Sequence, residues 1–522
     1  MNKKAYTVFI SLVVALGGFL LGFESAVISG ATPFYQGTFG LYPRSMLIGF
    51  SVSSLILGVI IGNIVAGRLA DRFGRRKILM YTAILFIINA AFNAFAYDII
   101  GFISGRLIGG LGVGMAILIA PMYIAEIAPR KLRGTLVTFS QLNIALGFSI
   151  ALFSNYYFQQ TISDPVFKWR IMLGAEALPA LLYLILLFFI PRSPRWLLQK
   201  GLGDEAQSVL VKIHGPEQSV FEHSEIINSL NQEDIKENAR WADVFSKRMK
   251  TVLIIGFGIV FFQQITGISA IFYYAPMIFE MAGGGMDASY LQAAILGVTF
   301  VVMTVVAILL IDRLGRKPLL YTGAAGICIS LAIVGLSFEN AKYTIDRKSL
   351  GTLMEEVVQL DVDEHHVENI MRLNQLKDNA FGSELSFFRL IKQTVGLDTY
   401  NSFKGIILKH SISVNPLWIL LGLVMFVASF AISLGPVMWT LLSEIFPNKL
   451  RGLAISVMGF WNSIVSYFVV IIFPVQLEYI GSTATFFIFS FFGLLTLFFV
   501  RRYVPETKGK SLEELESELV KQ

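Results

Sequence analysis

Long apolar runs dominate the chain and are separated by short polar segments. Two longer polar stretches, at 191–250 and 339–415, interrupt this pattern. A helix of about 20 apolar residues crosses the hydrocarbon core of a bilayer, so each run predicts one membrane-spanning helix. Twelve such runs lie near 6–29, 45–67, 78–97, 102–124, 134–157, 170–190, 251–280, 289–311, 318–338, 417–441, 453–476 and 483–502.

The pattern predicts an all-α integral membrane protein with twelve transmembrane helices in two six-helix halves. The expected parts are an N-terminal half at 1–190, a cytoplasmic linker with short helices at 191–250, a C-terminal half at 251–502 that carries the outer insertion 339–415, and a cytoplasmic tail at 503–522.

Composition supports a membrane protein and excludes several other classes. Hydrophobic residues make up 55% of the 522 residues and charged ones only 15%, whereas soluble domains carry about 25% charged residues. The single cysteine, Cys328, cannot form an internal disulfide. The chain has no Walker motif, nucleophile elbow, zinc-protease motif or paired-cysteine site. We therefore expect no catalytic residue, no metal, no ATP-driven transport and no enzyme activity.

The basic residues fall mainly on one side of the predicted membrane. With the N-terminus inside, 29 of the 42 Lys and Arg lie in inner segments, and the insertion holds nine of the remainder. Long translocated loops are largely exempt from the positive-inside rule. We therefore expect both termini in the cytoplasm. The net charge of +6 then reflects orientation in the lipid bilayer and gives no reason to expect nucleic acid as a partner.

The second half of the chain repeats the first. DRFGRRK at 71–77 recurs as DRLGRK at 312–317, and EIAPRKLRG at 126–134 recurs as EIFPNKLRG at 444–452. The offsets, 241 and 318, differ by the length of the insertion, so the second half is a copy with one outer segment added. Two repeated halves are typical of transporters with a substrate site between them. Within the insertion, His365-His366 lie among acids without metal-ligand spacing, and we assign them no chemistry.

Five motifs follow one another along the chain: GRLADRFGRR at 67–76, PRSPRWL at 191–197, QQITGI at 263–268, GPVMW at 435–439 and PETKG at 505–509. With the features above, they resemble the sugar porter family of the major facilitator superfamily over nearly the whole chain except 339–415. The resemblance implies the major facilitator fold and a monosaccharide substrate. The bacterial pentose (xylose)–proton symporters are most alike, which implies a proton as the coupling ion and no other cofactor. Arg192 departs from the family, which usually has Glu there.

Acids and bases alternate at the predicted cytoplasmic ends of the helices, at matched positions in both halves. Such groups favour ion pairs that bridge neighbouring helices, hold the inner gate shut and break when the halves rock. The alternative is that the bases only anchor the helices at the membrane surface. The predicted gate comprises Asp71, Arg72, Arg75, Arg76, Glu126, Arg133, Asp312, Arg313, Arg316, Glu444 and Arg451.

Three ionisable residues, Glu24, Arg106 and Glu176, lie inside predicted spans, where charges are costly and by default functional. Each lies about 6–10 Å below the outer end of its span at 1.5 Å per residue. Arg106 can neutralise one carboxylate. The other acid is expected to take up a proton near neutral pH, because desolvation disfavours its charged form. The resemblance assigns the same positions to a proton relay, and a static buried ion network is the alternative.

A sugar presents hydroxyls that both donate and accept, so carboxamides suit it, and an aromatic ring covers its C–H face. Carboxamides stand near the middle of spans 5, 7 and 11, and the Thr266–Ser269 stretch predicts a local helix break. Hydrogen bonding between helices is the alternative role for the glutamines. By resemblance, the sugar contacts are expected at Gln141, Gln263, Gln264, Ser269, Tyr273, Phe430, Trp439 and Asn462.

The departures from the family leave the identity of the sugar open. Ser269 stands where the family commonly has asparagine, and Ser463 follows Asn462 where a tryptophan is usual. We expect xylose, glucose or a similar monosaccharide, without a choice between pentose and hexose.

The functional hypothesis is a multi-pass cell-membrane protein, in the inner membrane if the organism is a Gram-negative bacterium, that imports a monosaccharide with a proton by alternating access. No obligatory protein partner is implied. A proton-independent facilitative uniporter is the alternative. A non-transporting sugar sensor is less favoured, because the segment after the last span, 503–522, is too short for a signalling tail.

Overall fold

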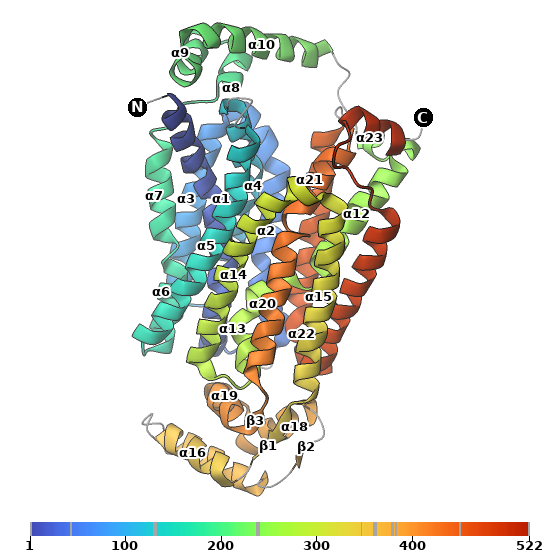
Figure 1. Ribbon diagram of the computed structural model, residues 1–522. Helices are drawn as coiled ribbons and strands as arrows, with labels where there is room; N and C mark the ends of the chain where they lie inside the picture. Colours follow the sequence, from blue (N-terminus) through green and yellow to red (C-terminus); the bar gives the residue numbers. More distant parts are fainter. Residues whose placement is uncertain are drawn as a thin grey trace.

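The structure is a computed structural model that describes residues 3–41, 44–128, 133–235, 241–345, 347–358, 363–376, 380–381, 384–447 and 450–519. Figure 1 shows two bundles of long helices side by side. The first contains α1 (Lys3–Thr38), α2 (Ser45–Phe73), α3 (Arg75–Phe95), α4 (Ile99–Ile127), α5 (Arg133–Thr161), α6 (Pro165–Gly174) and α7 (Ala177–Leu187). The second contains α12 (Lys250–Ile265), α13 (Ile268–Met281), α14 (Gly285–Leu314), α15 (Arg316–Glu339), α20 (Pro416–Ile432), α21 (Pro436–Ile445) and α22 (Arg451–Tyr503).

Ten of the described helical segments are long and apolar enough to cross a membrane, against twelve predicted spans. One of the ten, α22, has 53 residues, or about 80 Å at 1.5 Å per residue. Its backbone is interrupted at Gly481, where φ is 77°, so it contains both the span predicted at 453–476 and the one at 483–502. The span predicted at 134–157 corresponds to α5, which is not among the ten. In the described part of the chain, a helix therefore lies at each predicted span.

Three predicted spans are each broken into two helices. The run 170–190 forms α6 and α7 with Glu176 between them, and the run 417–441 forms α20 and α21, separated at Ser433. The run 251–280 breaks between α12 and α13 at Gly267, whose φ of 92° is left-handed. Glycine adopts this conformation without steric cost. The observed break at Gly267 confirms the break predicted at Thr266–Ser269.

Small residues allow helices within a half to approach closely. A Cβ added at Gly110 of α4 would lie 1.9 Å from the Leu55 carbonyl oxygen of α2. Close backbone contact at small residues is the usual way in which membrane helices pack, because lipid provides no hydrophobic drive between them.

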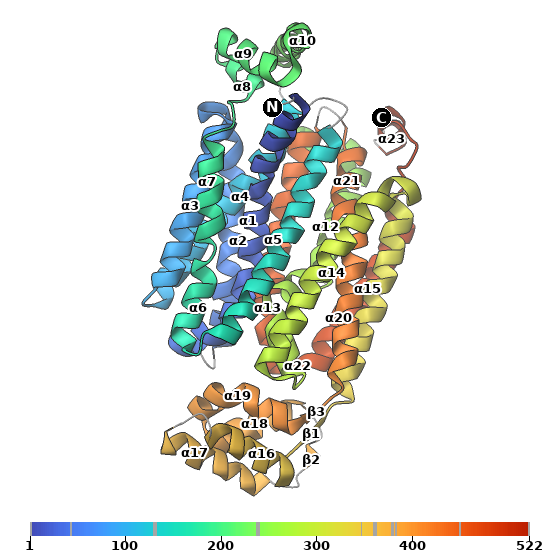
Figure 2. The ribbon, with the colours of Figure 1, turned by 60° about the vertical axis from the view of Figure 1, so that its left-hand side comes forward.

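The two ends of the bundle differ. Both chain termini and the linker helices lie at one end, here called the terminal end, and the insertion lies at the other, the insertion end (Figures 1 and 2). The linker contains α8 (Pro194–Gln199), α9 (Gly203–His214), α10 (Pro216–Ile235), α11 (Trp241–Val244) and the 3-10 helix η1 (Lys247–Met249), and α23 (Leu512–Leu519) ends the described chain.

The halves touch each other toward the insertion end. The Tyr290 hydroxyl of α14 donates a hydrogen bond to the Gly30 carbonyl of α1. Ser45, the first residue of α2, donates to the Glu478 carboxylate of α22. Nearer the centre, the Phe148 ring of α5 packs on Phe272 of α13, with ring centroids 4.2 Å apart. These contacts therefore hold the two halves together at this end.

The insertion folds as a small domain, whereas the sequence suggested only a polar segment. It contains β1 (Lys342–Thr344), α16 (Arg347–Val358), α17 (Glu364–Met371), the 3-10 helix η2 (Arg372–Leu376), β2 (Ala380–Phe381), α18 (Glu384–Val395), α19 (Leu397–Ser411) and β3 (Ile412–Ser413). The strands form an antiparallel sheet in the order β2-β1-β3. Tyr343, Phe387 and Ile391 belong to its own buried apolar core. No group that could hold a metal ion occurs among the described residues, the histidine pair included.

The insertion is attached to the C-terminal half and covers the seam between the halves. The buried Glu384 carboxylate accepts hydrogen bonds from the Ser482 backbone N–H at 2.7 Å and from its hydroxyl at 2.8 Å. Beneath the insertion lies a cavity of about 360 Å³, lined by Gln36 of α1, Lys392 of α18 and Pro474 of α22 among others. Its walls therefore come from both halves and from the insertion.

Candidate transport site

The three charged residues predicted inside the spans meet in the core of the N-terminal half. Arg106 of α4 forms an ion pair with Glu24 of α1, and neither side chain is more than 1% exposed. Glu176, at the break between α6 and α7, is also 1% exposed. Its Oε1 has no hydrogen-bond partner in the described structure. The single base is thus paired with Glu24 and leaves Glu176 as the second acid, the arrangement in which one carboxyl can take up a proton.

Asn89 of α3 joins the two acids. Its Nδ2 donates to Glu24 Oε2 at 2.9 Å and to Glu176 Oε2 at 2.8 Å, and its Oδ1 accepts from Asn93 Nδ2 at 2.7 Å. The sequence analysis missed this residue. Two carboxamides four residues apart in the apolar run 78–97 were the available signal, because i and i+4 side chains share a helix face.

Four predicted sugar contacts lie together in the C-terminal half. Asn462 Nδ2 of α22 donates to Gln263 Oε1 at 2.6 Å, and Gln264 Nε2 donates to Asn462 Oδ1 at 3.2 Å. Ser269 donates to Gln264 Oε1 at 2.6 Å and lies 2.9 Å from the Ser466 hydroxyl. Ser466 was not predicted, although it follows Asn462 by one helical turn. We call these five residues the amide cluster.

The helix break at Gly267 positions this cluster. It places the two glutamines at the end of α12 and Ser269 at the start of α13, so that their side chains meet. Gln263 Nε2 also donates to the Leu434 carbonyl, in the break between α20 and α21, at 2.8 Å. The amide cluster therefore joins both broken spans to α22 and offers several groups that can exchange partners with a polyhydroxylated ligand.

The other predicted sugar contacts stand apart from the amide cluster. Gln141 of α5 is exposed, and Trp439 of α21 is partly exposed. Phe430 is buried near the end of α20. Within the part of the chain that the structure describes, neither Gln141 nor Trp439 hydrogen-bonds to the amide cluster. Tyr273 is buried on α13, a helix that packs against α1 of the other half.

The predicted gate residues form matching ion pairs in both halves at the terminal end. Arg75 Nε lies 3.0 Å from Glu126 Oε1, and Arg75 Nη1 lies 3.2 Å from Asp71 Oδ1. The Ser193 hydroxyl donates a further hydrogen bond to the Glu126 carboxylate.

The C-terminal half repeats this arrangement. Arg316 Nη2 lies 2.8 Å from Glu444 Oε1 and 3.4 Å from Asp312 Oδ1, and Thr507 donates to Glu444 Oε2 at 2.5 Å. The internal repeat therefore extends to the geometry of the charged groups.

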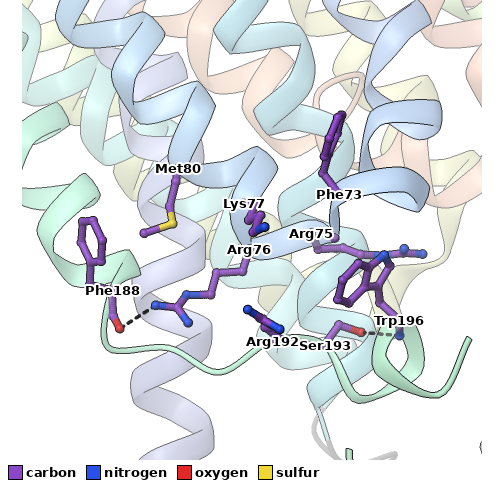
Figure 3. Close-up of a pocket in the computed structure, with 10 residues that line it drawn as sticks. Phe73, Arg75, Arg76, Lys77, Met80, Phe188, Arg192, Ser193 and Trp196 are labelled. Carbon is purple, nitrogen blue, oxygen red and sulfur yellow. Dashed lines mark hydrogen bonds between the residues drawn. The ribbon is translucent and has the colours of Figure 1, made fainter. Parts of the chain in front are cut away.

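The remaining predicted gate residues make contacts of other kinds. Arg76 donates to the Leu187 carbonyl at 3.0 Å and to the Phe188 carbonyl at 2.8 Å (Figure 3). Arg451 donates to the Phe446 carbonyl at 3.3 Å. The Arg133 side chain lies outside the described residues. The guanidinium of Arg72 lies 5.2 Å from the centre of the Phe73 ring, and Arg313 accepts a hydrogen bond from Lys508 through its carbonyl.

Each ion pair observed in this set joins helices of one half. Among the described residues, none crosses from one half to the other. A gate that these residues close between the halves therefore stays a prediction.

Glu506, in the PETKG motif, was quoted in the resemblance but not predicted to act. Its carboxylate accepts hydrogen bonds from the backbone N–H groups of Arg316 and Lys317, each at 3.1 Å, at the start of α15. Burial acts to raise the pKa of Glu506, but these bonds and those from Thr507 and Lys508 outweigh it and lower the pKa. A carboxylate at a helix N-terminus also interacts favourably with the helix dipole.

Comparison with known proteins agrees with this architecture. The sequence model of the sugar (and other) transporter family matches residues 10–354 and 400–519. The arabinose-proton symporter of Bacillus subtilis is 34% identical, with 100% of this chain and 96% of that protein covered. The D-xylose-proton symporter of Escherichia coli strain K12 is 32% identical, with 99% and 96% covered.

A solved structure is similar over the same length. The xylose transporter XylE from E. coli, in a partially occluded inward-open conformation, superimposes with a TM-score of 0.74 at 31% identity, with 97% of this chain and 100% of that chain covered. The chain is thus a multi-pass membrane protein and a member of the sugar transporter family of the major facilitator superfamily, a family of transporters and not of enzymes.

Proposed function

We propose that this protein imports a monosaccharide together with a proton by alternating access. The observation that carries the proposal is the buried centre in which two acids, Glu24 and Glu176, lie with one base, Arg106, which is paired with Glu24. A static ion network would be most stable with matched charges, whereas the second carboxyl here has an oxygen without a partner. Two similar proteins are named as proton symporters of arabinose and xylose, which supports the same class of activity.

The sugar binds at the amide cluster, where Gln263, Gln264 and Asn462 exchange their mutual hydrogen bonds for bonds to sugar hydroxyls. Because α13 packs against α1, the helix that carries Glu24, movement of α13 on sugar binding reaches the proton centre. The proton is the coupling ion, and the proposal needs no cofactor or protein partner beyond it.

The terminal end faces the cytoplasm in this proposal. The positive-inside distribution supports this orientation, and so does the similarity to a structure that is inward open. The contacts between the halves at Tyr290–Gly30 and Ser45–Glu478 then close the outer side. A cysteine introduced for Met371 in the insertion, in a protein lacking Cys328, should react with an impermeant thiol reagent added outside intact cells, and one introduced for His214 should not.

Coupling is tested with Glu24→Gln in proteoliposomes. The wild type should concentrate sugar when a proton gradient is imposed and make the medium outside alkaline. The variant should still exchange labelled sugar across the membrane but should not concentrate it. Glu280→Gln, which changes a buried carboxyl of α13 outside the proton centre, is the matched control and should concentrate sugar. Unchanged concentrative uptake by Glu24→Gln would identify a facilitative uniporter whose acids are structural.

The sugar site is tested with Gln264→Ala across a panel of pentoses and hexoses. Loss of a carboxamide bonded to Asn462 and Ser269 should weaken the preferred sugar at least about tenfold, or about 1.4 kcal/mol. Gln159→Ala, at the far end of α5, should bind sugar normally. Wild-type affinity in Gln264→Ala would place the sugar elsewhere, and binding without exchange in the wild type would indicate a sensor.

A further inference from the structure

A second cavity lies at the terminal end of the N-terminal half, remote from the amide cluster. It has a volume of about 210 Å³ and lies between the start of α3, the end of α7 and the segment that leads into α8 (Figure 3). The Trp196 ring packs against Gly74 and forms one wall. Its basic lining residues are Arg75, Arg76, Lys77 and Arg192.

The positive charge of this cavity is only partly compensated. Arg75 is neutralised by Asp71 and Glu126, but the donors of Arg76 go to uncharged carbonyls. Lys77 has no carboxylate within 4.0 Å among the described residues.

The fourth base is weakly compensated. Arg192 lies 3.4 Å from Glu205, and these two side chains are 41% and 44% exposed, so solvent weakens the pair. The four lining bases are therefore accompanied by three carboxylates, Asp71, Glu126 and Glu205, and the cavity keeps a net positive charge.

The internal repeat shows which group occupies the equivalent place in the other half. Arg75 and Arg76 correspond to Arg316 and Lys317 by the offset of 241. In the C-terminal half, the backbone N–H groups of Arg316 and Lys317 donate to the carboxylate of Glu506. A bound anionic group at this place is thus observed within the same molecule.

Arg192 stands where this carboxylate would come from in the N-terminal half. Ser193 and Thr507 donate to the corresponding acids Glu126 and Glu444, which aligns the two segments and pairs Arg192 with Glu506. Compared with Glu506 in the C-terminal half, the arginine at position 192 removes an acid and adds a base beside Arg76 and Lys77. Like charges gathered at one site are unfavourable unless an anion joins them.

We propose that this cavity binds a phosphate group, from either a soluble phosphate or a lipid headgroup. Guanidinium groups recognise phosphate oxygens with paired donors, and Arg76 and Arg192 line the cavity together with Lys77. The first backbone N–H groups of α3 supply further donors. The bound phosphate occupies the position in the N-terminal half that corresponds to the Glu506 carboxylate in the C-terminal half, and it links α3 to the segment 191–196. The site lies within one half and does not depend on which sugar is carried.

The test uses the purified full chain in micelles of dodecyl maltoside, a detergent without phosphate, with radiolabelled inorganic phosphate in equilibrium dialysis against chloride of equal ionic strength. The wild type should bind phosphate saturably. Arg192→Glu should weaken binding at least tenfold, because its carboxylate occupies the site as Glu506 does. Lys200→Glu makes the same change of charge on an exposed residue outside the cavity and should bind phosphate as the wild type does.

The thermal unfolding midpoint separates this effect from misfolding. Without phosphate, Arg192→Glu should unfold at or above the wild-type temperature, and added phosphate should raise the midpoint of the wild type only. If Arg192→Glu does not fold, Arg192→Gln should fold with weakened phosphate binding.

Nanodiscs doped with phosphatidic acid form a second arm. Stabilisation by the doped lipid alone identifies a headgroup, and stabilisation by inorganic phosphate alone identifies a soluble ligand. Absence of both effects in the wild type, or equal binding by wild type and Arg192→Glu, overturns the proposal. Sugar binding, measured in the same samples, reports separately on the transport site.

Discussion

Asn89 offers a sharp test of the buried proton centre, because one side chain serves both acids. In Asn89→Leu, an apolar group of similar size replaces a carboxamide that donates at 2.9 Å to Glu24 and at 2.8 Å to Glu176. The two side chains have the same heavy-atom branching, so the main change is the loss of two hydrogen bonds to buried carboxyl groups and of the one accepted from Asn93.

The magnitude follows from the contacts. A hydrogen bond to a charged group contributes about 1.5–3 kcal/mol and a neutral one about 1 kcal/mol, so at pH 8 the variant should lose about 4–7 kcal/mol of unfolding free energy. Protonation of a carboxyl removes the need for a donor. Each proton taken up by the variant but not by the wild type recovers about 1.36 kcal/mol per pH unit. One such proton should therefore shrink the difference by at most about 4 kcal/mol between pH 8 and pH 5.

The assay is urea unfolding in detergent at both pH values, followed by circular dichroism. Asn93→Leu is the matched control, because Asn93 is equally buried but donates only to Asn89, at 2.7 Å. It should lose about 1 kcal/mol, the contribution of a neutral hydrogen bond, by the same amount at both pH values. A loss in Asn89→Leu that is no larger than in the control, or that does not change with pH, would refute the reasoning.

Three further predictions concern other parts of the molecule. Burial raises the pKa of Glu384, so it favours folding in its protonated form; wild-type stability should fall as pH rises through the raised pKa, and Glu384→Gln, which keeps a partner for Ser482, should lack that slope in urea titrations. The pKa of Glu506 is lowered from 4.5 by backbone hydrogen bonds that outweigh burial; the stability lost in Glu506→Gln should be largest at neutral pH and vanish as acid protonates the wild type. Gly267→Ala adds a Cβ 2.6 Å from the Phe489 ring at a φ of 92°; it should cost about 1–3 kcal/mol and weaken sugar binding in the same preparation, whereas wild-type affinity would show that the break need not be held.

The helices could be predicted from sequence because membrane spans leave a strong signal. Apolar runs and the repeated motifs located every span, and glycine marked the break at Gly267. The breaks at Glu176 and Ser433 also lie next to helix-breaking residues, Gly174 and the Gly435-Pro436 pair, and the sequence analysis did not use these signals.

The site was predicted in part. Gln263, Gln264 and Asn462 stood out as carboxamides in apolar surroundings, and the structure places them in contact. Asn89 was missed, because only the fold brings α3 between α1 and the α6–α7 break.

The insertion was the least predictable part. Its polar composition suggested a solvated segment, but its apolar residues lie at helical spacing over a span too short for a membrane helix. The bond from Glu384 to Ser482 joins residues about a hundred positions apart, a pairing that no local pattern contains.

The position of the insertion also allows transport to be followed as a change of distance within the protein. It is attached to the C-terminal half through Glu384, while N-terminal residues such as Gln36 form part of the cavity beneath it. In the proposed transport cycle, opening of the insertion end must move the insertion away from the N-terminal half. Fluorophores at Met46 and Met371, both well exposed, would convert each turnover into a change in energy transfer, readable on single molecules without labelled sugar.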